Sequence, residues 1–359
     1  MAVKASGSPL SFSEIETEFG QNSDRDLGEY RVSQTVGGLS NQPLDASIPQ
    51  SGAIKFSDFY SKRLNVVIDY HSGSTENRPS DARTKYQAGS TSGNRTVIGG
   101  FKDRILGNSS GSKVRIHVNK TIGSAVGNVN NCAVRTGSFE TGTVVTVEVG
   151  SSGAIYGAGG NGGGAGTSDG DKDGDNGGSG SSGLGVQFSG TTVINNGVIS
   201  AGYGGGGGGG YRKVEREEMF SGPVYAASGG GGGGGQGLPG GEGLDGGADG
   251  TISAGGNGGA GGENNQAHGG GGGGGAGSTP GEGGEGGNNN DGTDGTGTVG
   301  GNGASGTHTG SIEGENNVQG SGANGGGSGA AIRRSSSSIE ITYAVSGTIN
   351  GDISATGVS

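Results

Sequence analysis

The sequence predicts a mainly β protein with a glycine-rich C-terminal half, and three observations support this. Glycine supplies 95 of the 359 residues and is concentrated between 151 and 330. Hydrophobic residues make up only 27%, without tryptophan, so one large apolar core is not expected. Runs of β-branched residues before 150 have the pattern of strands. We expect an N-terminal module with short helices in 1–62, a β-sandwich-like domain in 63–150, a glycine-rich domain in 151–335 and closing β-strands in 336–359.

The N-terminal module contains an internal echo. Leu10–Ile15 and Ile54–Phe59 share an apolar alternation followed by Ser and an acidic residue. Ser11 and Glu14 have the spacing of a helix capping box. We therefore expect a small module of short strands and two short helices.

The segments LSFSEIETEFG (Leu10–Gly20) and IPQSGAIKFSDFYSK (Ile48–Lys62) resemble the N-terminal segment of many tail-fibre and structural proteins of marine bacteriophages, especially cyanophages. The resemblance implies attachment to a virion by docking on other phage tail or fibre proteins. The segment recurs on proteins with different C-terminal halves, so the specific role stays open.

Residues 63–150 have the pattern of strands separated by polar loops. Leu64–Tyr70, Lys113–Val118 and Thr143–Val149 are β-branched runs, and the second alternates strictly between apolar and polar residues. Thr96–Ile98 is a weaker candidate. A small β-sandwich or sheet fits these runs.

Three runs of seven glycines are the most unusual feature of the chain: Gly204–Gly210, Gly229–Gly235 and Gly269–Gly275. Equal lengths indicate runs that stand side by side. Glycine can form polyproline-II-type helices with three residues per turn and a rise of about 3.1 Å, which lack internal hydrogen bonds. Buried helices of this kind must bond laterally, and only glycine allows the backbones so close. We predict a bundle of packed polyglycine-II helices; the alternative, a flexible linker, predicts disorder.

A Gly-x-Ile motif recurs beside the glycine runs. It occurs as Gly153-Ala-Ile155, Gly197-Val-Ile199 and Gly250-Thr-Ile252, with looser copies at Gly310 and Gly347. A β-branched run precedes three of the copies. We expect strands whose isoleucines share one apolar seam and form a β layer at the base of the bundle.

Residues 141–359 are similar in pattern to the tip adhesins of the long tail fibres of T-even phages. The resemblance implies packed polyglycine-II segments whose distal loops bind the host receptor. The chain differs from that family in its N-terminal module, which leaves its docking partner undefined.

Segments between the glycine runs are the candidate receptor-binding loops. They are too large and polar to lie inside a glycine bundle, and loops on a rigid scaffold commonly carry recognition. The competing interpretation is solubilising turns, since Asn-Gly and Asp-Gly suit turns. The candidates are Tyr211, Arg212, Arg216, Phe220, Tyr225, Asn264, Asn265, His268, Asn289, Asp291 and Asn316.

Charge and composition exclude several classes of function. The net charge is −11, with the excess of acidic residues in 151–330, which argues against binding of nucleic acid. No apolar stretch approaches a membrane span, and the first residues lack a secretion signal, so we expect synthesis in a host cytoplasm. The single cysteine, Cys132, excludes an internal disulfide. No histidine spacing or nucleotide-binding motif supports an enzyme.

No cofactor is predicted, with one alternative kept open. Asp169, Asp171 and Asp173 match the opening of a calcium-binding loop, but Gly180 stands where such a loop needs a glutamate. A solvated acidic loop is the competing interpretation.

Together these patterns predict a tail-fibre or tail-tip protein of a phage virion that binds the host cell surface, through lipopolysaccharide or an outer-membrane protein. The alternative is a structural baseplate, tail-hub or fibre-connecting protein. The sequence leaves open whether the chain forms a homotrimer.

Overall fold

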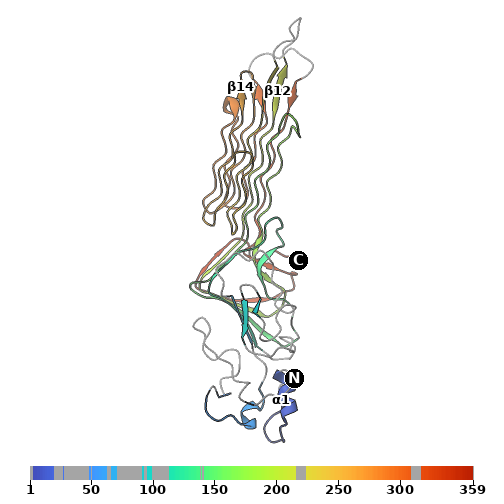
Figure 1. The fold of residues 1–359 in the computed structure, drawn as a ribbon, viewed down its shortest axis with the longest axis vertical. Coiled ribbons are helices and arrows are strands. Elements are labelled where there is room, and N and C mark those ends of the chain that lie inside the picture. Colours follow the sequence, from blue (N-terminus) through green and yellow to red (C-terminus); the bar gives the residue numbers. More distant parts are fainter. Residues whose placement is uncertain are drawn as a thin grey trace.

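The protein is elongated and mainly β (Figure 1). The structure, a computed structural model, describes residues 3–19, 27, 48–49, 51–62, 66–70, 91–92, 95–98, 113–137, 139, 141–215, 224–308 and 317–358. A small helical part lies at one end, three sheets lie in the middle, and a long shaft of extended glycine segments leads to the opposite end. No helix in these ranges is both long and apolar enough to cross a membrane.

The two copies of the N-terminal echo form two short helices that meet. Helix α1 spans Phe12–Phe19 and the 3-10 helix η2 spans Phe56–Phe59. In α1, Glu14 Oε2 accepts hydrogen bonds from the Ser11 backbone N–H and hydroxyl at 2.7 and 2.9 Å. The Lys4 side chain, followed by the bonds from Ser11, lowers the pKa of Glu14 to about 2. The Phe12 and Phe56 rings contact edge to face with 6.0 Å between centroids.

Three sheets form the middle of the molecule. The first has the order β19-β10-β7-β4-β1-β3-β2 and contains β1 (Val66–Tyr70), β2 (Thr91–Ser92), β3 (Arg95–Ile98), β4 (Lys113–Val118), β7 (Val144–Val149), β10 (Thr191–Asn195) and β19 (Ile341–Val345). The second has the order β20-β11-β8-β5 and contains β5 (Thr121–Ile122), β8 (Ala154–Tyr156), β11 (Val198–Ser200) and β20 (Thr348–Asn350). The third has the order β18-β9-β6 and contains β6 (Cys132–Arg135), β9 (Ser182–Val186) and β18 (Ile332–Arg334).

Successive strands enter different sheets, so the chain winds as a coil instead of the β-sandwich expected for 63–150. β4, β5 and β6 form one turn, β7, β8 and β9 the next, and β10, β11 and β18 a third, with β4–β7 and β7–β10 paired in parallel. Only two residues separate β4 from β5, too few for a strand to turn back and pair within its own sheet by a parallel crossover. We call these strands, with β19 and β20, the three-sheet coil; it draws residues from three of the predicted ranges.

Apolar ladders fill the three-sheet coil. Ile122, Ile155, Ile199 and Ile349 stack across the second sheet, as the Gly-x-Ile repeats predict for the last three. The first three of these side chains are fully buried. The prediction was wrong for Ile252, which is 41% exposed beside a turn closed by the Thr251 N–H and the Ala254 carbonyl, 2.8 Å apart. Gly310 lies outside the described residues.

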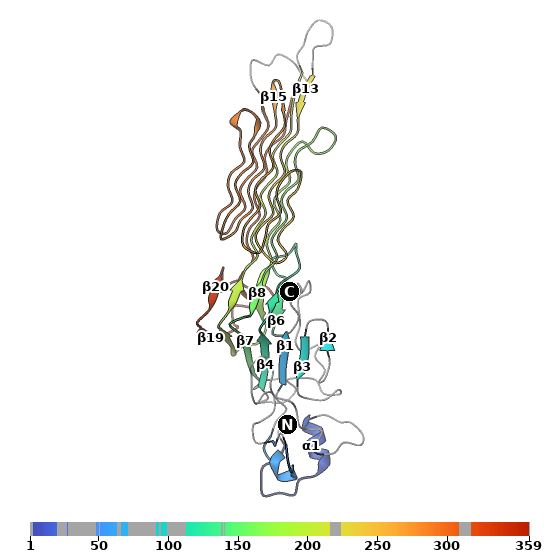
Figure 2. The ribbon, with the colours of Figure 1, turned by 60° about the vertical axis from the view of Figure 1, so that its left-hand side comes forward.

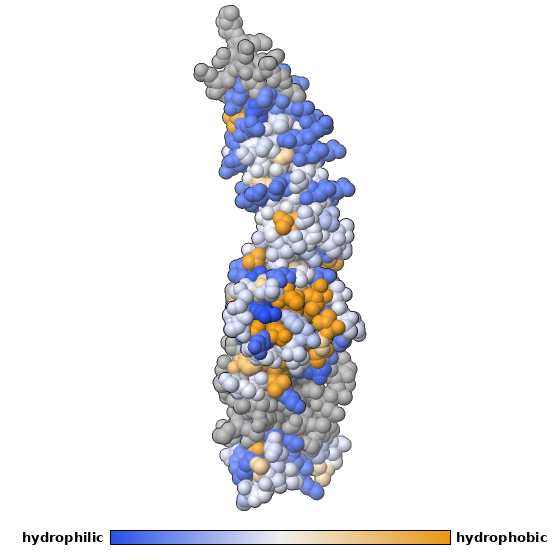
Figure 3. Space-filling model, turned by 180° about the vertical axis from the view of Figure 1, so that it is seen from behind, coloured by the Kyte–Doolittle hydropathy of each residue, from blue (hydrophilic) through white to orange (hydrophobic). Residues whose placement is uncertain are grey.

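The glycine-rich segments are two insertions into the three-sheet coil. The chain leaves after β8, returns at β9, leaves again after β11 and returns at β18. We call residues 157–181 and 201–331 the glycine shaft. Figure 3 shows hydrophobic residues gathered over the sheets, while the shaft surface is pale or hydrophilic. Among the described residues, the large hydrophobic core belongs to the sheets and the N-terminal part, and the length of the shaft contributes almost nothing to it.

Backbone hydrogen bonds take the place of that core. The Gly206 N–H donates to the Gly233 carbonyl at 2.8 Å, Gly233 to Gly273 at 2.9 Å, and Gly273 to Gly207 at 2.8 Å. The same cycle recurs three residues along, through Gly209, Gly230, Gly270 and Gly210. The three seven-glycine runs are buried and lie side by side at the centre of the shaft.

The first run bonds to six surrounding segments: 157–166, 174–181, 229–237, 269–277, 300–306 and 320–329. There is no space for side chains between them. A Cβ on Gly206 would lie 2.0 Å from the Gly273 carbonyl oxygen, and one on Gly233 would lie 2.0 Å from that of Gly256. Glycine is required at these positions for close approach and not for an unusual φ.

The outer segments of the shaft lack neighbours on one side, and short polar side chains bond to their free N–H groups. Asn161 Oδ1 accepts from the Glu242 N–H at 3.1 Å, and Asn257 Oδ1 accepts from the Glu282 N–H at 3.0 Å. Asp294 and Asp291 accept from Gly283 and Gly286, both at 2.9 Å. The three-residue spacing of the two aspartates matches the period of the central hydrogen bonds.

Candidate functional site: the distal end of the shaft

Four chain connections meet at the end of the glycine shaft that lies far from the sheets (Figures 1 and 2). The described secondary structure there consists of β12 (Arg212–Glu215), β13 (Val224–Ala227), β14 (Glu263–Asn264), β15 (Ala267–His268), η3 (Gly287–Asn289), β16 (Thr307–His308) and β17 (Val318–Gln319). Two small antiparallel sheets join them, in the orders β13-β12-β17 and β14-β15-β16. We call this region the tip.

A few side chains and pairings fix the tip. Val214, Ala227 and Ala267 form a small buried cluster on which Tyr225 packs. Arg212 pairs with Gln319, and Ala267 pairs with His308. Segments that are far apart in sequence therefore lie together at the tip, because the shaft segments that carry them end at the same height.

The exposed surface of the tip is rich in amides. Asn264, Asn265 and Asn289 are exposed, as is Asp291. Asn265 and Asn289 have positive φ values of 47° and 55°, which asparagine tolerates well in tight turns. The Asn264 side chain also donates to the Ala226 carbonyl at 3.2 Å and so ties β14 to β13.

The remaining predicted residues differ in burial. Tyr225 is half-buried, whereas Tyr211 and His268 are 3% and 8% exposed. Tyr211 serves the shaft: its N–H donates to the Lys172 carbonyl at 2.9 Å, and the Lys172 ammonium lies 5.0 Å from its ring centroid. Arg216, Phe220 and Asn316 lie outside the described residues.

Arg212 contacts His308, a residue that the sequence did not identify as a candidate. The Arg212 guanidinium Nη2 donates to His308 Nδ1 at 3.2 Å. Partial burial, followed by the charges of Arg212 and His268, lowers the pKa of His308. Burial lowers the pKa of Arg212 as well. No local motif identifies His308, since the pairing of β15 with β16 alone brings it to Arg212.

The acidic loop considered for calcium binding holds a lysine instead. The Lys172 ammonium donates to the Thr167 carbonyl at 3.0 Å and to the Ser168 carbonyl. Asp171 Oδ1 accepts from the Asp173 N–H at 3.3 Å, and Asp173 Oδ1 from the Ser321 N–H at 2.6 Å. Within the described ranges no three His, Cys, Asp or Glu side chains are grouped to hold a metal. The prediction of no cofactor, and its alternative of calcium binding by Asp169, Asp171 and Asp173, both stay predictions.

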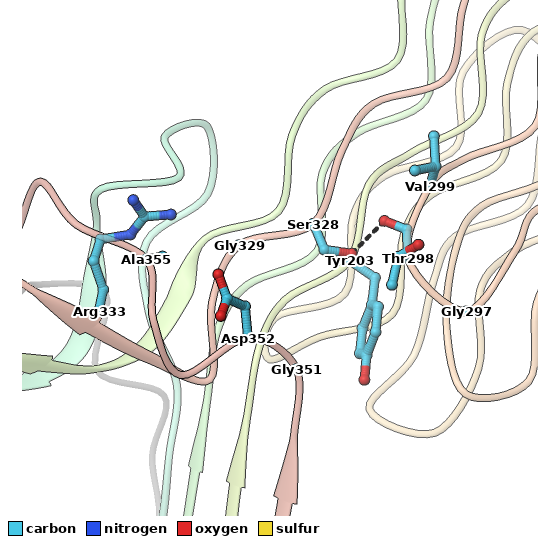
Figure 4. A pocket seen from close by; sticks show the side chains of 10 residues that line it. All are labelled: Tyr203, Gly297, Thr298, Val299, Ser328, Gly329, Arg333, Gly351, Asp352 and Ala355. Carbon is cyan, nitrogen blue, oxygen red and sulfur yellow. Dashed lines mark hydrogen bonds between the residues drawn. The ribbon is translucent and has the colours of Figure 1, made fainter.

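A cavity of about 350 Å³ lies at the opposite, proximal end of the shaft, where it meets the three-sheet coil (Figure 4). Tyr203, Thr298, Arg333 and Asp352 contribute polar groups to it. The Arg333 guanidinium is already engaged, because Nε donates to the Ser182 hydroxyl at 2.9 Å and Nη1 to the Thr356 carbonyl at 2.6 Å. Arg333 therefore joins β18 to β9 and to the C-terminal segment.

Residues 83–251 match the family model of the phage tail fibre adhesin Gp38. The match covers a little less than half of the chain and includes most of the three-sheet coil and the first two seven-glycine runs. The resemblance to phage tail-fibre adhesins that the sequence predicts is confirmed for this stretch.

Among solved structures, the crystal structure of the gp37-gp38 adhesin tip complex of the bacteriophage S16 long tail fibre is similar to the chain. The two are 16% identical, with 98% of this chain and 99% of that chain covered and a TM-score of 0.36. No curated protein sequence is significantly similar to the chain.

Proposed function

We propose that this protein is a tail-fibre adhesin of a phage virion and that it binds the host surface through the tip of the glycine shaft. The family match supports the class of protein. The observation that carries the role of the tip is the meeting of four separate connections at one end of a rigid scaffold. Exposed amides, a carboxylate and Tyr225 there offer the groups by which proteins commonly bind sugars or other proteins.

We further infer that the shaft is a bundle of polyglycine-II helices. The three-residue period of the hydrogen bonds and the six neighbours of Gly204–Gly210 support this inference. At the centre of such a lattice the bonds between neighbours join backbone groups, as they do around the three seven-glycine runs. Loop sequences at the tip can then vary without changing what holds the shaft together.

The opposite end of the molecule would join the virion. The N-terminal module, with α1 and η2, would dock on other tail or fibre proteins, as its sequence resemblance implies. It lies at the end of the molecule farthest from the tip (Figure 2). Lipopolysaccharide or an outer-membrane protein is the proposed receptor.

A tip variant tests this function. It combines Val224→Lys, Asn265→Gly and Asn289→Gly with two glycines in place of residues 216–223. The turn at Asn265 has positive φ, so glycine preserves it. The matched control is Ile252→Lys, an exposed position at the opposite end of the shaft.

We expect the wild type and the control to bind host cells and the tip variant to lose binding at unchanged melting temperature. A strain resistant to the phage should bind none of the three. Wild-type binding by the tip variant would contradict the proposal. A folded wild type that binds no cells, but whose absence stops particle assembly, would favour the structural baseplate, tail-hub or fibre-connecting role.

A further inference from the structure

We propose that the tip carries a binding site for a tetrahedral oxyanion, a phosphate or sulfate group, formed by Arg212 together with His308. The two side chains come from β12 and β16, and the Arg212 guanidinium contacts the His308 ring between the two tip sheets. The inference rests on the proposed function only for the source of the anion, a phosphorylated group of the host surface.

The charge of Arg212 is the first argument. Arg212 is only 4% exposed, yet no carboxylate among the described residues forms an ion pair with it. Buried charges in proteins are normally paired, since an unpaired one loses its hydration without compensation. An anion bound at the tip would supply a counter-charge that the described residues do not.

The unused donor of Arg212 is the second argument. Its Nε–H is buried and has no hydrogen-bond acceptor within the described part of the chain. Nη2 donates only to the neutral nitrogen of His308. Guanidinium groups bind phosphate and sulfate oxygens through two parallel N–H donors, a geometry that a single imidazole nitrogen cannot satisfy.

His308 provides the entrance to the site. It is exposed, while Arg212 behind it is not. In the present contact His308 Nδ1 accepts a hydrogen bond, so the imidazole is neutral. If an oxyanion takes the Arg212 donors, a protonated His308 can turn outward and donate to the same anion.

Anion binding should therefore be coupled to protonation of His308. Among the described residues, the Arg212 guanidinium of β12 faces His308, and the charges of Arg212 and of His268 on β15 both disfavour its imidazolium form. Glu263 lies opposite His268 in the register of β14 and β15, η3 carries no titratable side chain, and Lys213 and Glu215 of β12 form an ion pair with each other. A bound anion reverses the effect on His308, so affinity should rise as pH falls through the His308 pKa.

Sulfate is a suitable probe because its charge stays constant between about pH 5 and 8. Calorimetric titration of the full chain at constant ionic strength should show one sulfate site that binds more tightly at the acidic end. Arg212→Gln should weaken binding by about tenfold or more, the loss expected for a charge-assisted hydrogen bond. Lys213→Gln, next to Arg212 on the same strand, should bind like the wild type.

His308→Asn keeps the test valid if Arg212→Gln does not fold, because His308 is exposed. It should retain the melting temperature and lose the pH dependence of sulfate affinity. Absence of sulfate binding by the wild type, or equal affinity in Lys213→Gln and Arg212→Gln, would overturn the proposal. So would an unchanged pH dependence in His308→Asn.

Vesicles distinguish the sources of the anion. Binding to vesicles that carry a phosphorylated glycolipid, but not to vesicles with its dephosphorylated form, supports the site and assigns it to the host surface. Sulfate and phosphate binding without vesicle binding supports the site for a free anion. Cell binding that survives Arg212→Gln while sulfate binding was never present would reject this site and leave the proposed adhesin function standing.

Discussion

At the scale of single residues, glycine is required in the shaft because of its neighbours. Gly233 is fully enclosed: an added Cβ would meet the Gly256 carbonyl oxygen at 2.0 Å. Gly327 belongs to the same shaft, but a Cβ there would meet nothing within 4 Å. The two glycines therefore lie in the same shaft but differ in the space available for a side chain.

This contrast predicts the effect of two alanines. Gly233→Ala should destabilise the protein by about 3 kcal/mol or more, since backbone segments must move apart, whereas Gly327→Ala should change stability by less than about 0.5 kcal/mol. Chemical denaturation of the two variants measures the difference. Equal stabilities would show that the shaft is not closely packed.

The neighbouring glycine runs could be predicted from the sequence, whereas the polar side chains that bond to the outer shaft segments could not. Three runs of equal length predict neighbouring segments, because lateral bonding is the only way to satisfy buried glycine backbones. The roles of Asn161, Asn257 and Asp294 as acceptors for shaft N–H groups were missed. The three-residue spacing of Asp291 and Asp294 can be recognised as meaningful only once the period of the shaft is known.

At the scale of elements, the isoleucine ladder joins the turns of the three-sheet coil. Ile199 is buried between Ile155 and Ile349. Ile252 has the same sequence context, Gly-x-Ile-Ser-Ala-Gly, but lies exposed in a turn. The motif is therefore compatible with a buried strand and with an exposed turn. The β-branched run that precedes the copies at Ile155 and Ile199, and is absent before Ile252, distinguishes the strand copies.

Two further substitutions test this assignment. Ile199→Ala should cost about 2–5 kcal/mol of unfolding free energy through the lost burial and the cavity left behind, and Ile252→Ala should cost less than about 0.5 kcal/mol. Thermal unfolding followed by circular dichroism compares them. A larger loss for Ile252→Ala would mean that the wrong copies of the motif form the ladder.

The main strands of 63–150 were predicted correctly, but their assembly into a β-sandwich was not. Lys113–Val118 and Thr143–Val149 were predicted as strands, and β4 and β7 occupy almost the same residues. Their alternation identifies a buried face but not the direction of the neighbouring strand. Pairing with β10 and β19, which follow the glycine insertions, could not be read from local pattern.

At the scale of the whole molecule, the shaft separates the tip from the three sheets and the N-terminal module (Figure 1). The size and charge of the segments between the seven-glycine runs predict that these segments leave the shaft, and Asn264 and Asn265 lie exposed at the tip. The sequence did not predict the burial of Tyr211 and Arg212 or the contact of Arg212 with His308. These depend on β12, β15 and β16 meeting at the tip, a long-range consequence of how the shaft segments are ordered.

The most direct test of the central claim asks which end of the protein touches the host. A photo-crosslinker is attached to cysteine in Val224→Cys at the tip, which is 53% exposed, or in Ile252→Cys at the proximal end of the shaft, which is 41% exposed. The native Cys132 does not compete, because it is fully buried and burial raises its pKa to about 12. We predict crosslinks to host surface components from position 224 and none from position 252. Crosslinks from position 252 alone, or from neither position on cells that bind the protein, would contradict the account.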